Sequence, residues 1–195
     1  MADILNDKEL ALCDEQGFLF EESVSLSLNS PTFIRRYMNS ALALSLDEEE
    51  DDVYAFSLTD LFAIVNAPYP QIQVGIAGKH YPKEVLYWMG YLYRYWVYYR
   101  YRNSKSLYRL CPSTTLYPAY FAYHTMDPKT AIENLEEDYL DAHPEEKEKE
   151  ATYAPISSAL QELRSASKPN QIAIDLLLKK PSNFLFCLIY EYSFI

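Results

Sequence analysis

The stretch Pro82–Arg102, PKEVLYWMGYLYRYWVYYRYR, decides the fold of this chain. Pro82 suits the first turn of a helix, and we expect that helix to run over about 82–102. Bulky residues occupy two opposite sides of this helix. One side holds Val85, Trp88, Met89, Leu92, Trp96 and Tyr99, and the other holds Tyr87, Arg94, Tyr98 and Tyr101. A helix that is bulky on both sides is typical of the buried centre of a bundle, with Gly90 as the expected point of closest approach.

Three further elements are predicted upstream of this central helix. Ser30-Pro31 begins an amphipathic helix of about three turns, with apolar residues at helical spacing as far as Leu42. Ser57 with Asp60 resembles a capping box and begins another helix, which the prolines after residue 67 close. The alternation over 71–76 predicts a short extended segment.

Three helices are predicted downstream. Ser104 is the expected cap of one helix and Ser113 the expected start of the next, which Pro118 is expected to shorten. Asp127-Pro128 begins the last helix, by the same pairing of a cap with a proline. The fold class that follows is mainly α, a compact multi-helix bundle around the central aromatic helix.

The length of 195 residues predicts one domain with an appendage. We expect a helical domain over 1–142, a charged linker over 143–150 and a C-terminal extension over 151–195. The apolar residues of 172–195 leave the extension three fates: docking on the domain, which we favour, pairing with another copy, or aggregation.

Charge is unevenly distributed along a chain whose net charge is -11. Residues 79–109 hold seven bases against Glu84, whereas 47–52 are six consecutive acids and 133–150 hold nine acids. Because phosphate contacts dominate affinity for nucleic acid and most of this surface repels phosphate, nucleic-acid binding is not favoured. The acidic runs are expected to be solvated faces.

The cysteines and the apolar runs exclude other classes. Three cysteines without CxxC spacing predict neither a structural zinc site nor a disulfide framework. The first twenty residues lack the pattern of a secretory signal, and no apolar run approaches the roughly 20 residues that cross a bilayer. We therefore expect a cytoplasmic protein that does not bind membranes.

The sequence contains no phosphate loop, metalloprotease, esterase or kinase motif, so we predict no catalytic set, cofactor or metal site. Arg94 is the sharpest candidate for a binding role. Inside an enclosed helix its guanidinium needs a carboxylate, a cluster of carbonyls or a bound anion, and a structural ion pair is the commonest solution.

Five residues are candidates for binding or interaction: Tyr91, Arg94, Trp96, Tyr120 and His124. Tyrosine, tryptophan and arginine dominate protein interfaces, which favours a protein-interaction role. The alternative is a small ligand-binding domain or enzyme with a pocket formed by Tyr91, Arg94, Tyr120 and His124. An Arg94 paired with a buried acid supports a structural role, whereas Arg94 and His124 in one open cavity support the pocket.

Three motifs carry a resemblance to a known family. They are MGYLYRYW over 89–96, SKSLY over 104–108 and YFAYHTMDP over 120–128, followed by Ala131, Ile132 and Leu135. Over about 31–140 the chain resembles a family of small uncharacterised proteins of gut-type Gram-positive bacteria. That family shows the pattern GY(I/L)YRYW, SSKxIY and YHTMDPxxAI.

Members of the family resemble components of toxin/antitoxin-like cassettes and are encoded near an ADP-ribosyltransferase-like toxin. The resemblance implies an antitoxin-like or accessory component whose partner is a protein, such as a toxin encoded nearby. After Trp96 the family has a small polar turn, whereas this chain has the aromatic and basic run 97–102. The local partner surface therefore differs.

Overall fold

The computed structural model describes residues 5–25, 28–47, 60, 62, 63, 65 and 79–145. Within these residues the protein is mainly helical, with seven helices and no strand, so the predicted fold class is confirmed. The predicted segment at 71–76, most of the helix expected from Ser57, most of the linker over 143–150 and the whole of 151–195 lie outside the described residues.

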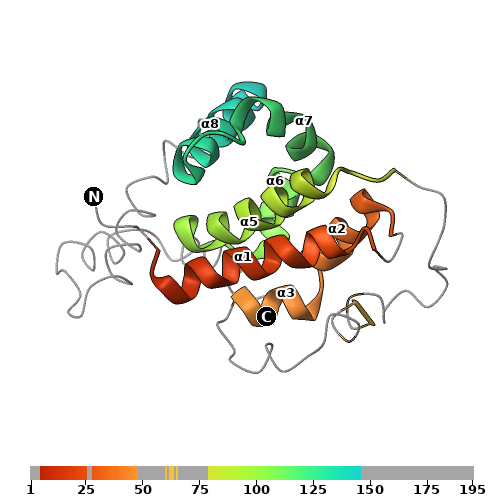
Figure 1. The fold of residues 1–195 in the computed structure, drawn as a ribbon. Coiled ribbons are helices and arrows are strands. Elements are labelled where there is room, and N and C mark those ends of the chain that lie inside the picture. Colours follow the sequence, from red (N-terminus) through yellow and green to blue (C-terminus); the bar gives the residue numbers. More distant parts are fainter. Residues whose placement is uncertain are drawn as a thin grey trace, which may run out of the picture. The chain divides into compact units, whose positions relative to one another are not determined.

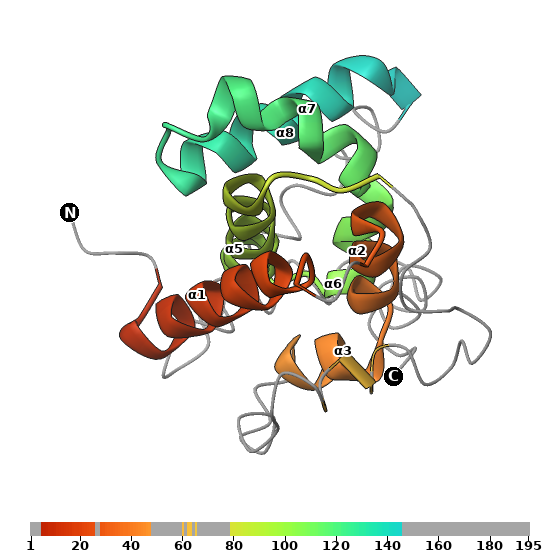
Figure 2. The same cartoon turned by 45° about the vertical axis from the view of Figure 1, so that its right-hand side comes forward.

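The seven helices are α1 (Asp7–Glu22), α2 (Ser30–Met38), α3 (Ala41–Asp47), α5 (Lys83–Arg100), α6 (Ser104–Leu110), α7 (Ser113–Tyr123) and α8 (Pro128–Ala142). The chain divides into two compact units, residues 1–139 and 140–195, and the packing described below belongs to the first. In that unit α5 lies between α7 and α8 on one side and α1 on the other, and α2 packs against α6 and α7 (Figures 1 and 2). None of the described helices has both the length and the apolar character that crossing a membrane requires.

Helix α5 is the buried centre that the sequence predicts. Eleven of its 18 residues are buried, and Trp96 and Arg94 are the largest of the fully buried side chains. The helix ends at Arg100, two residues before the predicted end, because Tyr101 adopts a left-handed conformation with φ 50°. A left-handed residue that follows the last turn is a common way for a helix to terminate.

Helices α1 and α5 touch at two glycines. A Cβ added to Gly90 would lie 2.5 Å from the backbone oxygen of Gln16 and 2.9 Å from the Cα of Gly17. The side chain of Gln16 crosses the same contact and donates from Nε2 to the backbone oxygen of Gly90 at 3.0 Å. The predicted role of Gly90 as a point of close approach is thus confirmed.

The N-terminal helix α1 is not predicted by the sequence analysis. It begins with a capping box, in which the side chain of Asn6 accepts from the backbone of Glu9 and the Glu9 carboxylate accepts from the backbone of Asn6. One of its buried residues, Gln16, is polar. The buried residues of α1 are Leu12, Cys13, Gln16, Gly17, Leu19 and Phe20.

The single helix predicted from Ser30 to Leu42 is wrong, because the chain turns after Met38 and begins α3 at Ala41. Ser40 explains the break: its hydroxyl donates to the backbone oxygen of Tyr37 and accepts from the backbone N–H of Ala43. The cap of α2 is Asn29 rather than Ser30, and it accepts from the N–H of Thr32.

The downstream boundaries agree more closely with expectation. Asp127 caps α8 as predicted, accepting from the backbone of Lys129 at 3.0 Å. Helix α6 is capped by Asn103, one residue before the expected Ser104. Helix α7 begins at Ser113 but runs through Pro118 to Tyr123, so the expected shortening is wrong.

Candidate functional site

Arg94 is fully buried and forms an ion pair. Its Nη1 lies 2.7 Å from Oδ1 of Asp47, and its Nε donates to Oε1 of Gln16 at 2.9 Å. Its Nη2 has no hydrogen-bond partner, and the guanidinium lies 5.6 Å from the centre of the Tyr98 ring. Of the partners considered from the sequence, the structure supplies a carboxylate.

Asp47 has a side chain only 6% exposed and accepts two further hydrogen bonds, from the backbone N–H and the hydroxyl of Ser104 at 2.6 and 2.7 Å. Burial raises the pKa of Asp47, while Arg94 and Ser104 oppose that rise. The hydroxyl of Tyr37 also donates to the oxygen of Gln16 that Arg94 contacts. We call these five residues the Arg94 cluster; it connects α1, α2, α3, α5 and α6.

The Arg94 cluster corrects one expectation. Asp47 begins the acidic run that was expected to be a solvated face, yet it is buried, so the expectation is wrong at this residue. Residues 48–52 lie outside the described part of the chain. Gln16 was not anticipated either, because it belongs to the unpredicted α1.

Trp96 also has an internal role. It is fully buried, and its Nε1 donates to Oε1 of Glu136 on α8 at 2.9 Å. Arg100 makes a bidentate ion pair with the same carboxylate. Glu136 therefore accepts hydrogen bonds from two residues on one side of α5, and these bonds hold α8 against α5.

Replacing Glu136 by alanine is expected to lower the free energy of unfolding by about 1–2 kcal/mol, because it removes charge-assisted hydrogen bonds that are partly screened by solvent. Urea unfolding followed by circular dichroism measures the loss. Glu137→Ala, at an exposed neighbour, is the control and should leave the midpoint unchanged. Equal midpoints for the two variants would contradict the assignment.

Tyr91 belongs to a row of tyrosines along α5, spaced four residues apart: Tyr87, Tyr91, Tyr95 and Tyr99. Successive ring centres in this row are 6.3 Å apart. Both ends of the row are hydrogen-bonded to neighbouring helices: the Tyr87 hydroxyl donates to Asp14 on α1, and the Tyr99 hydroxyl donates to Glu133 on α8 at 2.8 Å. Burial raises the pKa of Tyr91 to about 12.

Tyr120 and His124 lie together on α7 and at its end. The His124 ring stacks on Tyr120 with centres 4.3 Å apart, and the Tyr120 ring meets Trp88 edge-on at 5.5 Å. His124 is exposed, whereas Arg94 has no exposed surface and is bound to Gln16 and Asp47. The structure therefore does not bring Arg94 and His124 into one open cavity.

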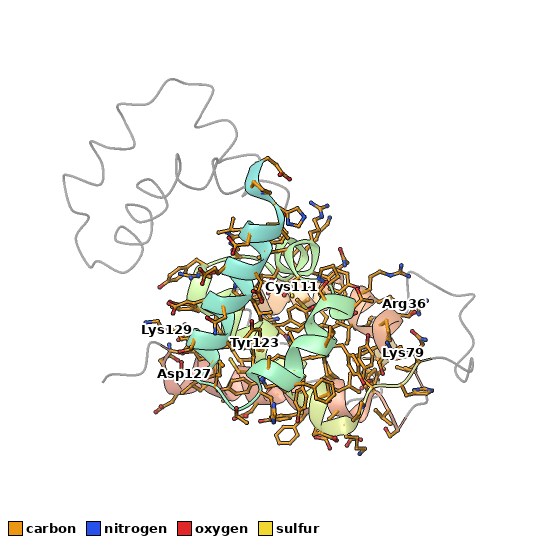
Figure 3. The ribbon with its side chains drawn as sticks, turned by 90° about the horizontal axis from the view of Figure 1, so that it is seen from above. Arg36, Lys79, Cys111, Tyr123, Asp127 and Lys129 are labelled. Atoms are coloured by element: carbon orange, nitrogen blue, oxygen red, sulfur yellow. The ribbon has the colours of Figure 1, made fainter. Side chains whose placement is uncertain are left out.

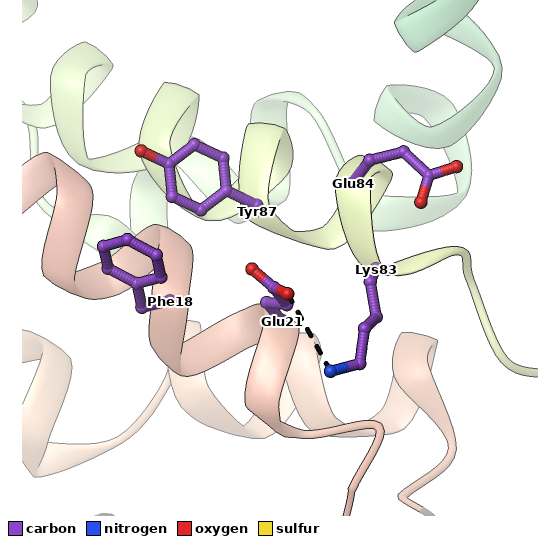
Figure 4. Close-up of a pocket in the computed structure, with 5 residues that line it drawn as sticks. All are labelled: Phe18, Glu21, Lys83, Glu84 and Tyr87. Atoms are coloured by element: carbon purple, nitrogen blue, oxygen red, sulfur yellow. Dashed lines mark ion pairs between the residues drawn. The ribbon is translucent and has the colours of Figure 1, made fainter.

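A shallow hollow of about 470 Å³ lies between α1 and α5 (Figure 4). Its floor holds the rings of Phe18 and Tyr87, which meet edge-on at 5.1 Å. Glu21, Glu84 and Lys83 complete the lining, and the Lys83 ammonium lies 3.8 Å from Glu21. Phe18 is 56% exposed, so a large apolar ring faces solvent among carboxylates. We call this feature the Phe18 hollow.

No residue of the Phe18 hollow is among the candidate site residues predicted from the sequence. Phe18 lies on the unpredicted α1, and Tyr87 was assigned only to an arc of the central helix. The capping box formed by Asn6 and Glu9 was the available signal for α1. On the wheel of α1, Phe20 falls on the buried stripe with Cys13, Gln16 and Gly17, whereas Phe18 lies on the opposite side.

The bases of 79–109 do not form a single exposed stripe. Arg94 pairs with Asp47, Arg100 with Glu136, and Lys83 with Glu21. Among the described residues, no group of three or more histidine, cysteine or acidic side chains is placed to hold a metal ion.

Two thiols are described, those of Cys13 and Cys111, and both are buried. Burial raises the pKa of each to about 12, which disfavours the reactive thiolate.

The chain matches no protein-family model, no curated protein and no solved structure. In its described residues the chain is a helical bundle whose fully buried cation, Arg94, is paired with Asp47 and whose exterior presents aromatic rings near acids.

Proposed function

We propose that the chain is a cytoplasmic protein-interaction component, antitoxin-like or accessory, that binds a partner protein with a basic surface. The Phe18 hollow supports this proposal. An aromatic ring that is 56% exposed and seated in a hollow has the character of an interface anchor. The resemblance of 31–140 to components of toxin/antitoxin-like cassettes supports a toxin encoded nearby as that partner.

The charge around the hollow indicates the sign of the charge on the partner's surface. Glu21 and Glu84 line it, Asp14 bonds to the Tyr87 hydroxyl, and Lys83 is drawn toward Glu21. The whole chain carries a net charge of -11. A field of this sign attracts a basic surface and increases the rate of association more than the final affinity.

Replacing Phe18 by lysine is expected to weaken the complex with this partner at least tenfold. The substitution removes the aromatic anchor and places a positive charge where a basic partner must approach. Co-expression with each product of the neighbouring genes identifies the partner, and titration of the purified pair measures the dissociation constant. For a toxic partner, relief of growth inhibition should weaken in parallel.

Ala41→Lys is the matched control, because it adds the same charge at an exposed position on α3. It should retain the affinity of the unmodified protein. The proposal fails if no neighbouring product forms a complex and growth inhibition is unchanged. The assignment to the Phe18 hollow fails if Phe18→Lys and Ala41→Lys bind equally.

A further inference from the structure

Within the part of the chain that the structure describes, one face of helix α7 is exposed. Five residues form this outer face of α7, and all are exposed: Thr114, Thr115, Pro118, Phe121 and Ala122. Phe121 is 70% exposed, more than Phe18 in its hollow. No charged residue occurs between Leu110 and Met126. An uncharged helix face with a protruding aromatic ring is unusual on a strongly acidic protein and indicates an interaction surface.

The opposite face of α7 fixes the orientation of the helix. Leu116 is fully buried, Tyr120 meets Trp88, and Tyr117 stacks on Tyr81 with ring centres 4.0 Å apart. These contacts hold the helix so that Phe121 points away from the core. The outer face is therefore a fixed surface and needs no rearrangement to bind.

The two sides of the outer face carry opposite charge. On one side, Nζ of Lys79 lies 5.0 Å from the centre of the Tyr117 ring, and the exposed Lys105 and Arg109 lie on the preceding helix. On the other side, the Tyr123 hydroxyl donates to Asp138 at 2.7 Å.

Helix α8 adds exposed acids at 133 and 137, against one lysine at 129. Figure 3 shows Lys79 on one side of this surface and Tyr123 and Asp127 on the other.

We propose that the outer face of α7 binds the same face of a second copy of this chain in an antiparallel, two-fold arrangement. A two-fold axis near Pro118 sets the basic side of one copy against the acidic side of the other, so that Lys79 of each copy approaches Asp138 of its mate. Opposite charge on the two sides makes this surface complementary to a second copy of itself. Because each copy carries a charge of -11, the uncharged face is also where two copies meet with least repulsion.

Charge reversal tests the pairing. Lys79→Asp and Asp138→Lys should each raise the dissociation constant of the dimer at least tenfold at low salt, because each change sets two pairs of like charges together. The double variant Lys79→Asp/Asp138→Lys restores unlike pairs in both places and should return the constant to within threefold of its original value. Phe121→Lys should leave a monomer. Sedimentation equilibrium over 1–500 µM, roughly spanning weak and tight self-association, gives the constants.

Controls separate this proposal from the proposed function. Ala41→Lys and Phe18→Lys should dimerise like the unmodified protein, and the thermal unfolding of every variant shows that it remains folded. A monomer throughout the concentration range overturns the proposal, as does a double variant at least as weak as the single ones. Because Phe121→Lys should still bind the basic partner as a monomer, loss of either interaction alone identifies which proposal has failed.

Discussion

Replacing Asp47 by alanine is expected to lower the free energy of unfolding by about 3–5 kcal/mol, the range found when one partner of a buried ion pair is removed. Arg94 would keep only Gln16 as a polar partner, at a position with no exposed surface. Ser104 would lose the acceptor of both its backbone N–H and its hydroxyl. Urea unfolding followed by far-ultraviolet circular dichroism measures the effect.

A double variant separates the cost of an unpaired charge from the value of the pair. Arg94→Met with Asp47→Leu removes both charges and keeps much of their volume, so its stability should lie within about 1–2 kcal/mol of the original. Asp47→Asn keeps an acceptor oxygen, so its free energy of unfolding should lie between those of Asp47→Ala and the double variant. A loss below about 1 kcal/mol for Asp47→Ala would mean that water reaches the guanidinium.

Replacing Gly90 by alanine is expected to cost about 2–3 kcal/mol even after the gain of about 1 kcal/mol in helix propensity. The new methyl group would lie 2.5 Å from the backbone oxygen of Gln16 and 2.9 Å from the Cα of Gly17. Both neighbours are backbone atoms, so α1 and α5 must separate. Thermal unfolding and the urea midpoint report the change.

Gly17→Ala is the informative comparison at the same helix contact. Its added Cβ would meet the ring of Tyr87 at 2.9 Å and the backbone oxygen of Tyr87 at 3.1 Å. A ring can turn aside more readily than a backbone, so Gly17→Ala should destabilise less than Gly90→Ala. The reverse order would show that the close approach at Gly90 is not the tighter one.

The central helix was predictable because its signal is local. Pro82 begins it, apolar and aromatic residues fill both arcs, and the buried residues of α5 confirm the arrangement. The cap at Asp127 was likewise encoded by two adjacent residues. Elements whose identity depends on their own few residues are those that a single sequence predicts best.

Helix α1 could not be predicted in the same way. Its buried face includes Gln16, whose oxygen serves Arg94 and Tyr37 and whose amide serves Gly90. A buried polar residue interrupts the apolar stripe by which an amphipathic helix is detected. The partners that justify Gln16 lie 21, 74 and 78 positions away, which no local pattern contains.

Tertiary packing also explains why the roles of the candidate site residues were only partly predicted. Arg94 was correctly expected to need a partner, but the sequence offered no means of choosing Asp47 among 28 acids. Tryptophan is a residue type common at protein interfaces, yet Trp96 is fully buried and donates a hydrogen bond to Glu136. Exposure decides whether an aromatic residue can meet a partner, and exposure is fixed by tertiary packing rather than by residue type.

The pairing of α1 with α5 has a consequence for synthesis of the protein. Helix α1 ends at Glu22, whereas its main partner ends at Arg100. At about 5–20 residues per second, roughly 4–16 s separate the synthesis of these two residues. During that interval the face of α1 that meets α5, including Gln16 and Gly17, lacks its partner. The newborn chain is therefore open to chaperones and proteases until α5 leaves the ribosome, and slower translation between the two helices prolongs that exposure.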